Sequence, residues 1–243
     1  MLAKTILPVA CVLAMTALTQ ASAQTCGDLN DSGEVTVADA LVLLRSAVGE
    51  PVTLQCPAPG VLGRTGQSMC WNAAGVEINC NGTFQDGDTR TGQPLAFSDN
   101  DNGTVTDNVT GLMWEKLSRN GTIHEVSDTF GWTNAFVKIH TLNDNKFGGF
   151  NDWRLPNERE LYSLVTFGGV AEQTISAVFR DDCEAGCAVS TCSCTATGRY
   201  WSATTDPYVP AKAEGVDFSQ AATFSAAKDT AQFVRAVRTV TDK

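Results

Sequence analysis

A twelve-residue loop near the start of the chain, residues 28–39, constrains the local fold more than any other stretch. Oxygen-bearing side chains stand at loop positions 1, 3, 5, 9 and 12, and Gly33 stands at position 6, where a calcium loop turns sharply. The donors are Asp28, Asn30, Ser32, Thr36 and Asp39, joined by the backbone carbonyl of Glu34. A polar turn with Asp39 as a helix N-cap is the alternative. The full spacing favours a Ca²⁺ site, followed by an amphipathic helix over residues 41–48.

The same loop resembles a single dockerin repeat. Position 12 is Asp39 where sensor loops have a bidentate Glu, and few helical residues precede the loop. Residues 27–30 and 38–41 also match the opening and the continuation of a dockerin loop. The resemblance implies the calcium site. The cohesin partner of dockerins is not carried over, because loop positions 10 and 11 are Val37 and Ala38, where dockerins often have Ser or Thr.

The start of the chain has the pattern of a secretion signal. Lys4 supplies the positive charge, Ile6–Leu18 the apolar core and Ala21–Ala23 the small-residue cleavage site. We expect cleavage after Ala23 and a location in the periplasm, outside the cell or at the cell surface. Lipidation at Cys11 is the weaker alternative, because little apolar sequence precedes it. No segment approaches the ~20 apolar residues that cross a membrane, so we predict no transmembrane segment.

The cysteines predict disulfides. Eight of the nine follow the cleavage site, and an even number in an exported chain is typical of a disulfide framework. Cys26 and Cys56 bracket the calcium loop, Cys70 and Cys80 can close a short hairpin, and Cys183, Cys187, Cys192 and Cys194 crowd one segment. Four thiolates in that segment would also suit Zn²⁺. We favour disulfides, because the spacing is not two Cys-x-x-Cys pairs and the compartment is oxidising.

The charge balance excludes some partners. The chain carries 17 Lys and Arg against 27 Asp and Glu, a formal net charge of −10, and loss of Lys4 with the signal makes it one unit more negative. Such a surface repels nucleic acid and anionic lipid, so we predict no nucleic-acid partner. It also argues against polyanionic sugars as ligands.

Three prolines between residues 51 and 59 mark a linker. We therefore divide the chain into a signal peptide (1–23), a dockerin-like calcium-binding module (24–56), a linker (57–63) and a larger domain (64–243). The larger domain is long enough to bury a core of its own.

Within the larger domain, apolar periodicity predicts helices over residues 131–142 and 157–167. Alternating and β-branched segments predict strands at residues 104–106, 111–115, 200–204, 215–218, 222–225 and 233–238. Two helices followed by several strands imply an α+β domain built on an antiparallel sheet.

Several short sequence words of this domain recur in order in a known family. They are Thr65-Gly66-Gln67, Gly82-Thr83, Gln85-Asp86-Gly87-Asp88, Phe97-Ser98-Asp99-Asn100, residues 103–108, residues 110–114, residues 152–157, residues 200–204 and residues 233–238. In this order they closely resemble the bacterial family named after the C-terminal domain of the Legionella collagen-like protein Lcl, over residues 64–240. The resemblance implies sulfated glycosaminoglycans as ligands, which the acidic balance of this chain disfavours.

The word Trp153-Arg154-Leu155-Pro156 also resembles the Arg-Leu-Pro-Thr stretch of sulfatase-modifying (formylglycine-generating) enzymes. That resemblance implies a C-type-lectin-like fold with two helices, a small antiparallel sheet and long ligand-bearing loops. It does not imply the activity of those enzymes. They use reactive cysteines near the end of their chains, and the last cysteine here is Cys194, upstream of the strand that contains Trp201.

Several residues have a structural and a functional interpretation. Asn102-Gly103 predicts a hairpin turn, because Gly supplies the positive φ. The acidic residues around this turn could either face solvent or bind a second calcium ion, and we favour the solvated turn. They are Asp99, Asp101 and Asp107. Four tryptophans fill the core or stack on a sugar, and we favour the core: Trp114, Trp132, Trp153 and Trp201. Three arginines are expected to pair with Asp152, Glu158 or Glu160: Arg154, Arg235 and Arg238.

No catalytic constellation is found in the sequence. His124 and His140 are expected as surface or helix residues, so we predict no catalytic residues and no enzyme. The favoured function is an exported, calcium-stabilised binding or adhesion protein that recognises a glycan or cell-surface ligand. Its binding surface is expected on two loops, residues 183–194 and residues 206–213 with Tyr208. The alternatives are an accessory module of a polysaccharide-degrading or other exported enzyme system, and a structural envelope protein.

Overall fold

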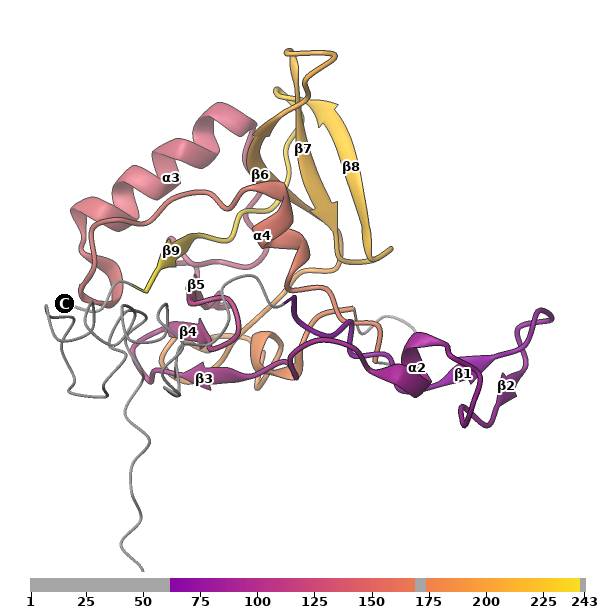
Figure 1. Ribbon diagram of the computed structural model, residues 1–243. Helices are drawn as coiled ribbons and strands as arrows, with labels where there is room; N and C mark the ends of the chain where they lie inside the picture. Colours follow the sequence, from indigo (N-terminus) through magenta and orange to yellow (C-terminus); the bar gives the residue numbers. More distant parts are fainter. Residues whose placement is uncertain (1–61, 169–173, 241–243) are drawn as a thin grey trace, which may run out of the picture. The chain divides into compact units, whose positions relative to one another are not determined.

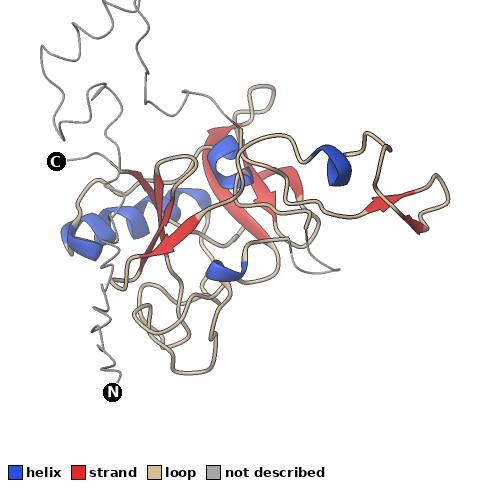
Figure 2. Cartoon of the chain, turned by 60° about the horizontal axis from the view of Figure 1, so that its bottom comes forward, coloured by secondary structure: helices blue, strands red, loops and turns tan. Residues whose placement is uncertain are grey.

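The computed structural model describes residues 62–168 and 174–240. The signal peptide, the calcium loop and the Cys26–Cys56 pair predicted above lie outside these residues. The described part contains few helices and three antiparallel sheets, which confirms the α+β class (Figures 1 and 2). None of its helices is long and apolar enough to span a lipid bilayer.

The first sheet has four strands in the order β3-β4-β5-β9, each antiparallel to its neighbour. The strands are β3 (Phe97–Asp99), β4 (Thr104–Asp107), β5 (Leu112–Glu115) and β9 (Val237–Thr239). The predicted hairpin turn joins β3 to β4, with Gly103 at a φ of 88°. A side chain there is excluded by space as well as by φ, because a Cβ atom would lie 2.8 Å from Val189.

The second sheet has three strands in the order β6-β7-β8, with β8 at its outer edge (Figure 1). They are β6 (Arg199–Thr205), β7 (Lys212–Asp217) and β8 (Ala222–Ala227). A separate small hairpin of β1 (Cys70–Trp71) and β2 (Glu77–Ile78) precedes the short helix α2 (Asp86–Thr89) (Figure 2).

Helix α3 (Trp132–Asp144) matches its prediction and buries one face, on which Ala135, Ile139 and Leu142 lie. Helix α4 (Glu158–Tyr162) begins as predicted. Its N-cap Asn157 accepts a hydrogen bond from the Glu160 backbone, and the Glu160 carboxylate accepts one in return.

The predicted extension of α4 to residue 167 is wrong. Val165 forms an antiparallel bridge with Ile175, and the backbone N–H of Thr166 donates to the carbonyl of Thr174. Tertiary pairing with the 174–175 segment therefore replaces the helical hydrogen bonds that an apolar pattern alone would favour. Two short 3₁₀ helices, η1 (Phe147–Gly149) and η2 (Ala177–Phe179), complete the described helical elements.

The predicted strand over residues 233–238 is only partly correct, because this segment crosses between the two sheets. The Phe233 backbone exchanges hydrogen bonds with Arg199 and Trp201 on β6. Three residues further on, the carbonyl of Ala236 accepts from Glu115 on β5, and only then does β9 begin. The segment thus joins the second sheet to the first.

The core contains three of the four tryptophans predicted there. Trp114, Trp153 and Trp201 are buried. Trp132 is only half-buried, and its indole N–H donates to the carbonyl of Ser202 at 2.8 Å, while Lys228 Nζ lies 4.0 Å from its ring centroid.

The disulfide prediction is confirmed for the described cysteines. They pair as Cys70–Cys80, Cys183–Cys194 and Cys187–Cys192. Because all four sulfurs of the crowded segment are bonded, none of them is a thiolate that would bind zinc.

Two of the three predicted arginine pairs are present. Arg154 makes a two-pronged pair with Glu160, both contacts at 2.7 Å. Arg238 pairs with Asp152 at 2.7 and 3.2 Å. The prediction is wrong for Arg235, which binds two backbone carbonyls and a hydroxyl.

Candidate functional site

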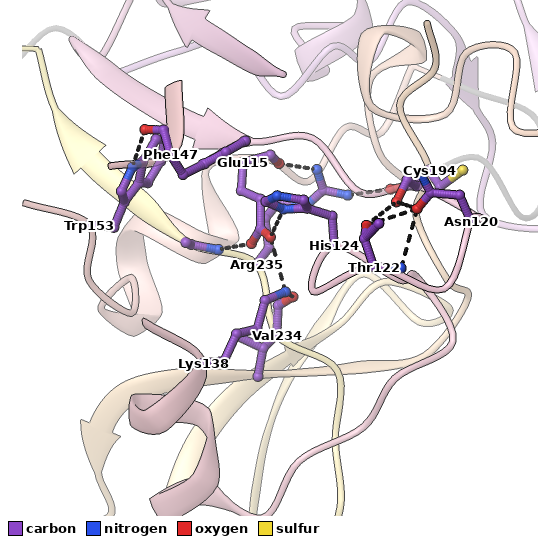
Figure 3. A network of polar contacts seen from close by, with 12 residues as sticks. Glu115, Asn120, Thr122, His124, Lys138, Phe147, Trp153, Cys194, Val234 and Arg235 are labelled. Atoms are coloured by element: carbon purple, nitrogen blue, oxygen red, sulfur yellow. Dashed lines mark hydrogen bonds and ion pairs between the residues drawn. The ribbon is translucent and has the colours of Figure 1, made fainter. Parts of the chain in front are cut away.

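Glu115, at the end of β5, is the centre of a buried charge network (Figure 3). Its Oε1 lies 2.8 Å from His124 Nδ1 and 3.1 Å from Lys138 Nζ on α3. Its Oε2 accepts a hydrogen bond from the Ala236 backbone at 2.9 Å. Burial alone would raise the pKa of Glu115, but the charge of Lys138 and the hydrogen bond of His124 outweigh burial and lower it to about 2.

Arg235 is fully buried beside this network, and none of the described carboxylates binds it directly. One guanidinium nitrogen donates to the Glu115 carbonyl at 2.7 Å, and another donates to the Cys194 carbonyl at 2.6 Å and to the Thr195 hydroxyl at 2.7 Å. Burial lowers its pKa. Arg235 therefore connects the crossing segment (residues 233–238) to β5 and to the cysteine-rich segment (residues 183–194). Sequence reasoning had no signal for its carbonyl partners, which lie far away along the chain.

The network joins β5 to helix α3, to the loop that contains His124 and to the segment that contains Ala236. His124 is buried in a loop and not on the surface or in a helix as expected, and its ring lies tilted against that of Phe147, with 4.3 Å between the ring centroids. In residues 62–168 and 174–240, no hydroxyl or thiol hydrogen bonds with its ring. His140 lies exposed on α3. A charged residue directly after the buried run Leu112–Trp114 was the one sequence signal for this network.

The first predicted binding loop, residues 183–194, is a rigid and partly buried segment. Its last three residues, Cys192 to Cys194, are buried. Backbone hydrogen bonds join Cys194 to Leu117 and Cys187 to Arg119. With two disulfides and these bonds, the loop is fixed against the end of β5, and its exposed residues are 184–186, 190 and 191.

The second predicted loop, between β6 and β7, presents an aromatic residue to solvent on a fixed turn. Tyr208 is 93% exposed and Val209 43%. One carboxylate oxygen of Asp206 accepts hydrogen bonds from both of their backbone N–H groups, at 2.8 and 2.9 Å. The other accepts from the Ser225 hydroxyl on β8 at 2.7 Å. The Ser225 bond and then these backbone bonds lower the pKa of Asp206.

The three acidic residues around the β3–β4 hairpin serve separate local contacts. Asp99 pairs with Lys116 at 2.7 Å, and the charge and hydrogen bond of that lysine outweigh burial and lower the Asp99 pKa. Asp107 accepts hydrogen bonds from Val109 and Thr110 in the next turn. Asp101 is exposed in the hairpin turn. These contacts agree with the favoured interpretation as turns.

The described residues thus define a disulfide-bonded α+β domain with a buried charge network and an exposed aromatic turn. The family model described as the Lcl C-terminal domain matches residues 103–238. This match spans more than half of the chain, so the protein belongs to the Lcl C-terminal domain family. No curated protein matches the chain.

Proposed function

We propose that this protein is an exported binding or adhesion protein that recognises a glycan or another cell-surface ligand through the β6–β7 turn. The observation that carries the proposal is the exposure of Tyr208 on a turn fixed by Asp206. A tyrosine offers a large apolar face and a hydroxyl, and it loses little conformational entropy on binding. The proposal assigns no catalytic residues.

The chemistry of the turn supports this choice. Pro207 and Pro210 flank the two exposed side chains and restrict the backbone of the turn. Its closing hydrogen bond, from the Lys212 N–H to the Val209 carbonyl, measures 2.8 Å. A preorganised apolar surface of this kind binds without first ordering a loop, which is a main cost of recognition.

The proposal includes a C-type-lectin-like arrangement of the domain and a calcium-binding module before it. Helices α3 and α4 and the small antiparallel sheets, joined by long loops, support the first part. The second part rests on the sequence of the loop at 28–39 and assigns the ion to Asp28, Asn30, Ser32, Glu34, Thr36 and Asp39. In an adhesion protein, this module would serve as a calcium-stabilised spacer between the larger domain and the surface to which the protein is attached.

The test is a glycan array probed with the mature protein and two variants. Tyr208→Ala is expected to lose binding, whereas Phe84→Ala, which removes another exposed aromatic residue, is expected to keep it. Phe84 is 84% exposed and lies far along the chain, before α2. If Tyr208→Ala and Phe84→Ala bind the array equally well, the β6–β7 turn is not the ligand-binding surface. A wild-type protein without any glycan or cell-surface ligand would favour a structural envelope role.

A further inference from the structure

A second candidate site lies away from the β6–β7 turn, in a groove of about 300 Å³. The segment 62–65, the turn between β4 and β5, and the residues of and after α4 form its walls. The apolar part of the lining includes Leu95, Val109, Tyr162 and Val165. Two cationic residues, Arg64 and Arg159, complete it.

These two arginines have no acidic partner among the described residues. Arg64 is held in place by a hydrogen bond from its Nε to the Gly92 carbonyl at 3.0 Å, which leaves its terminal nitrogens available. Asp107 also lines the groove, but its carboxylate accepts hydrogen bonds from Val109 and Thr110 of its own turn. Two guanidiniums and one carboxylate leave the groove with a net positive charge beside an apolar wall, and in a chain with net charge −10 this indicates a site for an anion that carries an apolar group.

The geometry of the groove narrows the class of ligand. A guanidinium binds a planar carboxylate through two parallel hydrogen bonds, so a carboxylate is an anion that these arginines can hold. A volume of about 300 Å³ is at the lower end for ligand pockets, so it suits one large apolar side chain and not an oligosaccharide or a long acyl chain. A free amino acid is disfavoured, because its ammonium group would lie beside two cations.

We propose that this groove binds the C-terminal residue of a partner peptide. The apolar side chain of that residue lies against Leu95, Val109 and Val165, and its α-carboxylate lies between Arg64 and Arg159. Capture of a chain-terminal carboxylate is a known mode of peptide recognition, in which charge selects the terminus and a pocket selects the side chain. The site is independent of the proposed Tyr208 surface.

The test compares four small probes, one of which is the fatty acid decanoate, on the mature protein by isothermal titration or NMR titration. N-acetyl-L-phenylalanine supplies the carboxylate and the side chain, its primary amide removes the charge, and free L-phenylalanine adds an ammonium group. We expect the acetylated acid to bind at least ~10-fold more tightly than either of the others, since a charged hydrogen-bonded pair is worth about one order of magnitude in affinity or more. Equal affinity for acid and amide would overturn the proposal, and so would tighter binding of decanoate.

Variants assign the binding to the groove. Arg159 is exposed on α4, so Arg159→Gln is expected to fold normally and to weaken binding of the acetylated acid ~10-fold. The matched control is Arg119→Gln, which removes an exposed arginine that does not line this groove. Tyr208→Ala is expected to leave this binding unchanged, which separates a failure here from a failure of the proposed function. Unchanged binding in Arg159→Gln would refute the site.

Discussion

At the scale of single residues, Glu115 is a fully buried carboxylate that contacts two cationic or titratable side chains, Lys138 and His124. A fully buried carboxylate is tolerated only because Lys138, His124 and a backbone N–H surround it. Glu115→Gln would leave Lys138 buried without its counter-charge. We expect a loss of about 3–5 kcal/mol in the free energy of unfolding, measured by urea denaturation.

The control for this substitution is Glu77→Gln, because Glu77 is exposed on β2. It should change the free energy of unfolding by no more than about 0.5 kcal/mol. A Glu115→Gln protein as stable as this control would show that the network contributes nothing to folding.

The lowered pKa of Glu115 also predicts how stability depends on pH. The group titrates near its ordinary value of 4.5 when unfolded and at about 2 when folded, so the unfolded state binds the proton more readily. The stabilisation is therefore complete above pH ~5 and is lost as the pH falls toward ~2, and it is on the order of 3 kcal/mol. The advantage of wild type over Glu115→Gln should shrink across this range in urea melts. An advantage that stays constant with pH would contradict the assigned pKa.

At the scale of elements, capping and turn residues predicted where helices and turns begin better than where they end. The cap at Asn157 and the turn at Gly103 depend on neighbours in sequence, and both were predictable. The end of α4 depends on the Val165–Ile175 bridge, and the course of residues 233–238 depends on two sheets at once. The buried position of His124 likewise depends on Glu115 and Phe147, so sequence periodicity held no signal for it.

The cysteine-rich segment gives an element-scale prediction. Its two disulfides, together with Cys70–Cys80, should be intact in protein purified under oxidising conditions, and Cys26 should pair with Cys56. Mass spectrometry of non-reduced peptides is expected to find no free thiol and no bound zinc. Stoichiometric zinc bound to residues 183–194 would contradict the disulfide pairing.

At the scale of the whole molecule, the proposed calcium loop should respond to the ion independently of the larger domain. Titration calorimetry on the mature protein is expected to show one main site, with a dissociation constant of about 10⁻⁴ to 10⁻³ M. Asp28→Ala removes the ligand at position 1 and should abolish the heat of binding. Asp31→Ala is the matched control, since position 4 of the loop supplies no ligand. Calcium heat that survives Asp28→Ala would place the ion elsewhere.

The crossing segment is synthesised after the strands that it links. Residues 232–240 bond to Phe130, to β6 and to β5, and Arg235 fills the space between them. The two sheets are thus fastened together by residues that leave the ribosome after all the strands they join. A nascent chain that stops short of residue 232 lacks the contacts that link the two sheets, and these contacts join residues that are distant in sequence. The two sheets of this domain can therefore be fastened together only after every strand that the segment joins has been synthesised.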